Sequence, residues 1–199
     1  MDDTGRIELF FGCMWSGKST ELIRQAKRYS NINKNIIIIN HSSDIRYGKN
    51  IVSTHDHSEI TCLSLNNLEL LKQYKEYRAC DIILIDEGQF FNDLFNFSVH
   101  AADIDKKTII VFGLDGDYKK EAFGDILKLI PHSEKVTKLN AFCQICKDGT
   151  LASFTKRLID SDKQEIIGNE DSYMAVCRKH YDMNLVSEGK QLENNIKFY

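Results

Sequence analysis

The sequence of 199 residues contains one proline, Pro131, and has no internal repeat or low-complexity tract. A flexible linker between independent domains is therefore not expected. No apolar run approaches the roughly 20 residues that a helix needs to cross a bilayer. The formal net charge of −3 also lacks the basic excess with which proteins bind nucleic-acid backbones. We therefore expect neither a membrane nor a nucleic acid as a partner.

We also expect no secretory leader. Met1-Asp2-Asp3 is acidic where such a leader is basic, and Glu8 interrupts the short apolar run that follows. We expect a cytoplasmic protein whose six cysteines are thiols or metal ligands rather than disulfides. Hydrophobic residues make up 42% and charged residues 28%, which is typical of a compact globular protein.

Strands and helices are predicted in alternation along the first part of the chain. An apolar strand over residues 7–11 precedes a helix over residues 19–29. Continuous runs of β-branched and apolar residues, typical of parallel strands covered on both faces, predict further strands at residues 36–39, 82–85 and 108–112. Residues 40–59 indicate a long polar loop or lid, and residues 67–77 indicate a helix. This alternation predicts a doubly wound parallel sheet of the α/β class.

The character of the sequence changes near Asn140, where we place a domain boundary. Beyond it, two short ligand-like pairs flank a polar stretch and the helical periodicity fades. The prediction is an α/β domain over residues 1–139 and a small metal-binding domain over residues 140–184, packed together. The polar residues 185–199 are expected to form a disordered tail.

A phosphate-binding loop is predicted between the first strand and the first helix. The sequence there matches the pattern Gly-x-x-x-x-Gly-Lys-Ser in the strand-to-helix context that a P-loop requires. Its amides would surround phosphate oxygens, Lys18 would reach the β- and γ-phosphates, and Ser19 would bind Mg²⁺. A glycine-rich turn that matches by accident is the disfavoured alternative. The candidate ATP-binding residues are Gly12, Cys13, Met14, Trp15, Ser16, Gly17, Lys18 and Ser19.

Two adjacent carboxylates, Asp86 and Glu87, follow the strand predicted at residues 82–85. In P-loop enzymes this is the form of a Walker B element, in which one carboxylate holds Mg²⁺. Asp86 is the candidate magnesium ligand beside Ser19, and Glu87 is the candidate general base for an attacking hydroxyl. Taken alone, the two carboxylates could equally mark a strand that simply ends at the solvent-exposed surface. The upstream P-loop favours the functional interpretation.

The pairs Cys143-x-x-Cys146 and Cys177-x-x-His180 have the spacing of a zinc ribbon. Three thiolates and one imidazole form a closed tetrahedral set, so we expect a structural zinc ion rather than a catalytic one. Coincidental thiols or a redox pair are the alternatives. Cys13, Cys62 and Cys80 have no such spacing and are interpreted as ordinary thiols.

These motifs together resemble the cytosolic and viral type of thymidine kinase over roughly residues 7–181. The resemblance is carried by the P-loop with its internal Met14, by Asp86-Glu87-Gly88-Gln89-Phe90-Phe91 and by the four predicted zinc ligands. Shorter matches in the same order support it. They are Asp44-Ile45-Arg46-Tyr47, Thr54-His55-Asp56, Leu114-Asp115-Gly116 and Thr155-Lys156-Arg157.

The resemblance implies a RecA-like P-loop core with a small zinc-ribbon domain that holds a "lasso" loop. It implies phosphate transfer from ATP to the 5′-hydroxyl of thymidine in nucleotide salvage, with Mg²⁺, and a homotetramer. Deoxyuridine is an alternative acceptor. Glu87 becomes the general base, and ATP and metal contacts are implied for Asp44, Ile45, Arg46, Asp86, Glu87, Gly88 and Gln89. Nucleoside contacts are implied for Met14, Phe90, Leu114, Tyr118, Phe123, Gln164, Glu165, Ile166, Ile167, Gly168 and Tyr173.

Without the resemblance, these aromatic residues would be read as core packing. His55 and His57 are interpreted as solvated loop residues. The sequence departs from the family pattern at Cys13, Trp15, Asp117, Ala122 and Gly168-Asn169, which leaves the nucleoside selectivity and any feedback inhibition by thymidine triphosphate open.

Two rival functions stay open at this point. One is a kinase on the same scaffold that prefers deoxyuridine or a purine deoxynucleoside. The other is a zinc-ribbon P-loop ATPase that binds DNA or RNA, which the acidic balance disfavours.

Overall fold

The computed structural model describes residues 4–44, 50–53, 58–159 and 172–183, and every structural statement concerns these residues. Its centre is a six-stranded sheet in the order β5-β2-β6-β7-β1-β8, and the pairings that the structure gives for it are parallel. These strands are β1 (Arg6–Gly12), β2 (Ile36–His41), β5 (Leu63–Leu65), β6 (Ile82–Ile85), β7 (Thr108–Gly113) and β8 (Lys135–Leu139). The α/β parallel sheet predicted from the sequence is confirmed.

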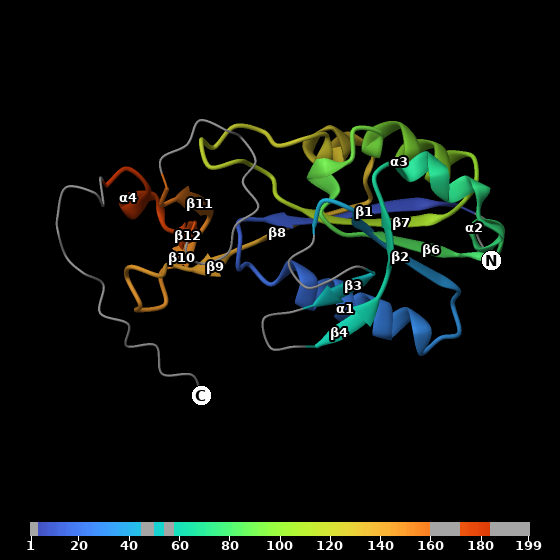
Figure 1. Cartoon of the computed structure of the whole chain (residues 1–199), viewed down its shortest axis with the longest axis horizontal. Helices are drawn as coiled ribbons and strands as arrows, with labels where there is room; N and C mark the ends of the chain where they lie inside the picture. Colours follow the sequence, from blue (N-terminus) through green and yellow to red (C-terminus); the bar gives the residue numbers. More distant parts are fainter. Residues whose placement is uncertain (1–3, 45–49, 54–57, 160–171, 184–199) are drawn as a thin grey trace.

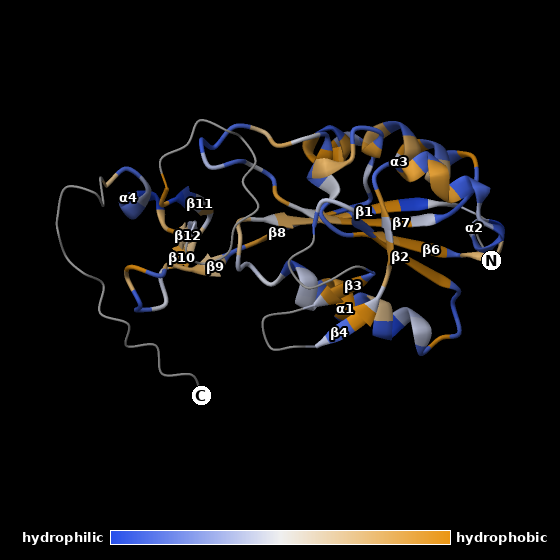
Figure 2. Ribbon diagram, viewed as in Figure 1, coloured by the Kyte–Doolittle hydropathy of each residue, from blue (hydrophilic) through white to orange (hydrophobic). Residues whose placement is uncertain are grey.

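Helices cover both faces of this sheet, as Figure 1 shows with α3 on one side and α1 on the other. Successive residues of each strand point to opposite faces, so Leu9 belongs to one core cluster and Phe10 to the other. The first face packs against η1 (Leu68–Gln73), α2 (Lys75–Ala79), α3 (Leu94–Asp103) and η3 (Ile126–His132). The second face packs mainly against α1 (Lys18–Ser30). Figure 2 shows the central strands as predominantly hydrophobic, as burial on both faces requires.

Two sequence expectations need correction. Part of the polar stretch predicted as a loop forms β3 (Ile51–Ser53), which pairs antiparallel with β4 (Glu59–Thr61) because Val52 is buried against the α1 face. The helix predicted over residues 67–77 is instead two short pieces, η1 and α2. Tyr74 separates them with an extended backbone at φ −81° and ψ 138°.

A smaller lobe lies beyond the end of β8, at the left of Figure 1. It consists of two antiparallel pairs and a short helix, and its small core includes Cys13 from the P-loop. Its elements are β9 (Ala141–Phe142), β10 (Leu151–Ala152), β11 (Phe154–Arg157), β12 (Tyr173–Val176) and α4 (Arg178–Tyr181). None of the helices in the described part of the chain has the length and apolarity of a membrane span.

Candidate active site and metal centre

The predicted P-loop connects β1 to α1 at one edge of the sheet. Its backbone turns through left-handed conformations at Trp15, with φ 61°, and at Gly17, with φ 82°. The Glu21 amide then donates to the Gly17 carbonyl at 2.9 Å and begins the helix. The strand, turn and helix therefore follow in the order that phosphate binding at a helix N-terminus requires.

Polar groups at this loop fit an anionic ligand. The Lys18 ammonium folds back and donates to the Cys13 carbonyl at 2.8 Å and the Gly12 carbonyl at 3.3 Å. Within the described residues, the buried Ser16 hydroxyl and Trp15 Nε1 have no hydrogen-bond partner. Buried polar groups are normally satisfied by protein, water or ligand. A phosphate group could supply acceptors to the Ser16 hydroxyl and the Lys18 ammonium.

The small lobe holds the P-loop directly. The Met14 amide donates to the Thr155 hydroxyl at 3.0 Å, and the Cys13 thiol donates to the Ala152 carbonyl at 3.3 Å. Burial raises the pKa of Cys13, which keeps it a neutral thiol donor. The loop is therefore fixed by β1 and α1 and also by residues about 140 positions further along the chain.

The acidic pair follows the carboxyl end of β6, on the same edge of the sheet as the P-loop. The Asp86 amide continues the strand pairing by donating to the Ile39 carbonyl at 2.8 Å. The Glu87 backbone is left-handed, with φ 50°, and its amide donates to the Asp86 carboxylate at 3.0 Å. Both carboxylates are buried. Buried carboxylates at parallel strand ends are suited to binding and proton transfer.

Gln89 joins the acidic pair to the end of the neighbouring strand β7. Its Nε2 donates to Glu87 Oε2 at 2.5 Å, and its Oε1 accepts from the Leu114 amide at 2.9 Å. Gly88 and Gln89 lie in the short 3-10 helix η2 (Gly88–Phe90). The structure thus brings Glu87, Gln89 and Leu114 into one hydrogen-bonded group.

Aromatic side chains gather beside this group. The rings of Phe90 and Phe123 meet edge to face, with centroids 5.6 Å apart. His41, at the end of β2, contacts Phe91 with centroids 4.7 Å apart. Near the same strand end, the side-chain Nδ2 of Asn40 donates to the Asp44 carboxylate at 3.1 Å. The Phe90–Phe123 pair places two apolar ring surfaces, nearly perpendicular to each other, beside the acidic group.

Two further predicted residues, Tyr118 and Tyr173, are joined by Arg157. The Arg157 guanidinium lies 3.5 Å from the Tyr118 ring centroid, and its Nη2 donates to the Tyr173 hydroxyl at 2.9 Å. The Tyr181 hydroxyl donates to the Tyr118 carbonyl. Thr155 and Arg157 were not predicted as site residues, although both belong to the Thr155-Lys156-Arg157 motif of the sequence. That motif was the signal in the sequence that could have indicated these two residues.

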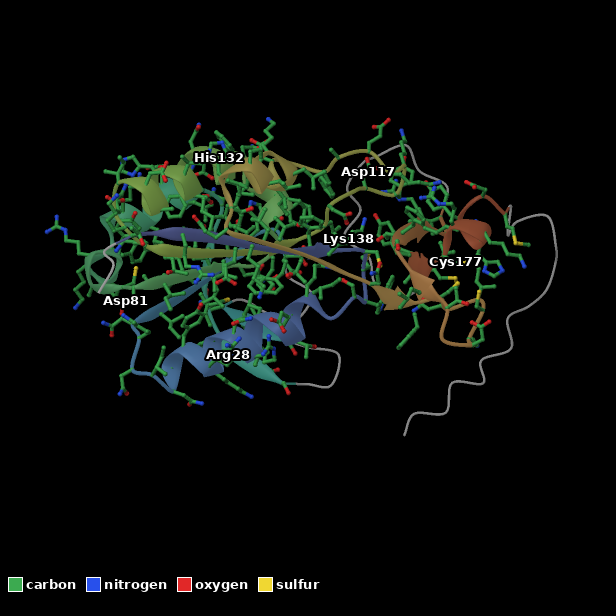
Figure 3. All side chains as sticks on the ribbon, turned by 180° about the vertical axis from the view of Figure 1, so that it is seen from behind. Arg28, Asp81, Asp117, His132, Lys138 and Cys177 are labelled. Carbon is green, nitrogen blue, oxygen red and sulfur yellow. The ribbon has the colours of Figure 1, made fainter. Side chains whose placement is uncertain are left out.

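The four predicted zinc ligands lie together in the small lobe, where Figure 3 shows Cys177 among the sulfur atoms. A tetrahedral zinc ion with Zn–S of about 2.3 Å and Zn–N of about 2.0–2.1 Å separates sulfur atoms by about 3.8 Å, and sulfur from nitrogen by about 3.5 Å. The Sγ atoms of Cys146 and Cys177 are 3.8 Å apart, and His180 Nδ1 lies 3.3–3.5 Å from the three thiols.

The electrostatics of this cluster also suit a metal. Burial raises the pKa of Cys143, but hydrogen bonds from the backbone amides of Cys146, Cys177 and Ile145 outweigh it and lower the pKa to about 6. A thiolate is the form that ligates zinc. The three cysteines and the histidine therefore form a set that could hold one zinc ion.

Comparison with known proteins identifies the family. The sequence profile described as thymidine kinase matches residues 5–181. The chain belongs to the thymidine kinase family.

Similar proteins come from plants, viruses and an amoeba. A thymidine kinase of Sheeppox virus is 46% identical over 181 residues, covering 90% of this chain and 98% of the viral protein. Thymidine kinase a of Arabidopsis thaliana is 40% identical over 200 residues, covering 98% of this chain and 83% of the plant protein. Thymidine kinase 1 of Dictyostelium discoideum is 40% identical over 182 residues, covering 89% of this chain and 78% of the amoebal protein.

Several residues predicted for this thymidine kinase family member lie outside the described part of the chain. They are Ile45 and Arg46, which follow Asp44 in sequence, and Gln164, Glu165, Ile166, Ile167 and Gly168 of the expected lasso. His55, His57 and the tail over residues 185–199 also lie outside it.

A cavity of about 180 Å³ separates the P-loop from the segment after β7, and Cys13, Asp115, Lys138 and Thr155 are among its lining residues. Lys138 and Asp115 pair across 2.6 Å. The Asp117 carboxylate accepts from the amides of Lys119 and Glu121 and so caps its own turn. Figure 3 shows Asp117 and Lys138 at the junction with the small lobe.

Proposed function

We propose that this protein is an ATP-dependent thymidine kinase that transfers the γ-phosphoryl group of ATP to the 5′-hydroxyl of thymidine. The observation that carries the proposal is the placement of two elements at one edge of the sheet. In a chain of the thymidine kinase family, the P-loop after β1 and the buried Asp86–Glu87 pair after β6 occupy the carboxyl ends of parallel strands, where nucleotides bind.

ATP would be held by the amides of residues 12–19 and by Lys18, whose ammonium would exchange its loop carbonyls for phosphate oxygens. Asp44 to Arg46 and Gly88 are proposed as further contacts near the nucleotide. Ser19 and Asp86 would hold Mg²⁺, which supplies neutralising charge to the phosphate oxygens when bound.

Glu87 is proposed as the general base. Its carboxylate would accept the proton of the 5′-hydroxyl as that oxygen bonds to the γ-phosphorus and the bond to the bridging oxygen of ADP breaks. Burial excludes competing water from this carboxylate, and the left-handed backbone directs the residue away from the regular strand path.

The nucleoside is proposed to lie against the aromatic group of Phe90 and Phe123, with Met14 and Leu114 as apolar neighbours. Tyr118 and Tyr173 would border the site, fixed relative to each other by Arg157. The predicted lasso, residues Gln164 to Gly168, would complete it. Deoxyuridine is proposed as an alternative substrate.

The zinc ion is proposed to be structural, because the four ligands Cys143, Cys146, Cys177 and His180 leave no open position. We propose the domain division at Asn140, with residues 140–184 as the zinc-binding lasso domain and residues 185–199 as a tail. A homotetramer and a cytoplasmic location are also proposed, supported by the family resemblance.

Transfer of labelled phosphate from ATP to each common deoxynucleoside tests this function. Wild-type protein should produce thymidine monophosphate, and Glu87→Gln should lower the rate roughly 10²- to 10⁴-fold because the general base is lost. A preference for another nucleoside would support the rival kinase. ATP hydrolysis stimulated by DNA or RNA, with no nucleoside product, would reject the kinase and support the rival ATPase.

A further inference from the structure

We propose that Gln89 is a positioning residue that orients the Glu87 carboxylate for proton abstraction, an inference that rests on the proposed function. Gln89 is 4% exposed, and both ends of its amide are hydrogen-bonded within the protein. It lies two residues from Glu87 in sequence, yet its other partner, Leu114, directly follows the neighbouring strand β7. The side chain therefore connects the proposed base to the segment that begins the proposed nucleoside site.

The hydrogen-bond network fixes which way the Gln89 amide points. The Leu114 N–H is a donor, so the amide atom that faces it must be the acceptor Oε1. This places Nε2, a donor, on Glu87 Oε2 at 2.5 Å. Because one carboxylate oxygen is held by this donor, rotation of the Glu87 carboxyl group is restricted.

The space around Gln89 is shaped by two glycines. A Cβ atom at Gly113 would lie 2.4 Å from Gln89 Oε1, and a Cβ atom at Gly124, where φ is +61°, would lie 2.3 Å from the Gln89 carbonyl oxygen. A larger residue at either position would displace Gln89. Gly113 therefore packs closely against the Gln89 side chain, and Gly124 packs closely against the Gln89 backbone.

The left-handed backbone at Glu87 needs stabilising contacts from the surrounding residues. A left-handed conformation at a non-glycine residue is unfavourable and persists only where the surroundings stabilise it. The turn is closed by the Phe90 amide, which donates to the Glu87 carbonyl at 3.0 Å. This bond fixes the main chain, while Gln89 fixes the side chain. A misplacement of a catalytic group by about 1 Å can cost about 10²-fold in rate.

The test is Gln89→Met, which preserves length and burial and removes both hydrogen bonds. We expect kcat to fall about 10- to 100-fold, with KM for ATP and thymidine changed less than threefold. Gln25→Met is the matched control. Gln25 is also a buried glutamine with both amide ends bonded, to Glu21 and Arg28, but it lies on α1 away from the acidic pair. Its kcat should stay within twofold of wild type.

A double-mutant cycle separates positioning from general destabilisation. In the Glu87→Gln background there is no base to orient, so adding Gln89→Met should change kcat less than twofold. An equal loss in both backgrounds would overturn the proposal and assign Gln89 a structural role. A large rise in KM for ATP without a fall in kcat would also overturn it, because Gln89 would then act as a nucleotide contact.

Gln89→Glu provides a second variant if the methionine variant does not fold. It retains an acceptor for the Leu114 amide but places a second carboxyl group against Glu87, which raises the pKa of the pair. At pH 7, kcat should therefore fall as in Gln89→Met, and it should recover as the pH is raised. Wild-type activity toward thymidine, measured first, keeps the two hypotheses apart. Inactive wild-type protein rejects the proposed function, whereas active wild type with unchanged kcat in Gln89→Met rejects only the positioning role.

Discussion

The hydrogen bond from the Met14 amide to Thr155 is predicted to be required for high ATP affinity. Thr155→Val keeps the shape of the side chain and removes the acceptor, so the Met14 N–H loses its 3.0 Å partner. Thr155 is buried, and a buried donor without a partner costs about 1–3 kcal/mol. If the ATP-binding conformation of the loop bears this cost, KM for ATP rises about 5- to 150-fold.

The assay is steady-state kinetics with ATP varied at saturating thymidine, together with thermal unfolding of each variant. Thr137→Val is the control, because Thr137 lies partly buried on β8 and its hydroxyl has no hydrogen bond within the described part of the chain. Thr137→Val should leave KM for ATP unchanged. A Thr155→Val protein with wild-type KM for ATP would refute the reasoning, since the P-loop would then not depend on the small lobe.

Two other predictions concern the metal and the pH dependence of stability. The purified protein should carry one zinc ion per chain by metal analysis, and Cys143→Ser should lose it and unfold the small lobe; a stable, metal-free, active protein would contradict this. Tyr77 donates to the Asp105 carboxylate at 2.5 Å. Burial alone would raise the pKa of Asp105, but this bond and His100 lower it. The bond therefore stabilises the fold above the unfolded pKa of about 3.9 and less below it. Tyr77→Phe should cost about 1.5–3 kcal/mol at pH 7 by urea unfolding, and a deficit that does not shrink below pH 4 would argue against the bond.

The sequence was sufficient for β2, β6 and β7 because each contains a continuous apolar run, and for β1 because Glu8 alone interrupts its apolar run. The strand at Ile82–Ile85 has the predicted bounds. Helix α3 was not predicted, although its buried Leu94, Phe97 and Ala101 recur at helical spacing and could have indicated it. Strand β8 was not predicted because it is a half-exposed edge strand that alternates little and carries two lysines.

The candidate site likewise contains features that the sequence could predict and features that it could not. The P-loop, the acidic pair and each half of the metal cluster are local motifs, so the sequence could indicate them before the fold was known. The contact of Thr155 with Met14 spans 141 positions, and that of Tyr181 with Tyr118 spans 63. Such contacts leave no periodicity or spacing in the sequence, and they depend on how the lobe packs against the sheet.

Strand β11 explains how the metal centre can influence chemistry at a distance. Thr155 holds the P-loop, and Arg157 joins Tyr118 to Tyr173. Between them, the Lys156 ammonium donates to the carbonyls of His180 at 3.0 Å and Tyr181 at 2.8 Å. His180 is a proposed zinc ligand, so one strand contacts the metal-binding helix, the proposed ATP site and the proposed nucleoside site. Zinc removal by a chelator should therefore raise KM for both substrates together. A rise for thymidine alone would confine the metal's influence to the nucleoside side.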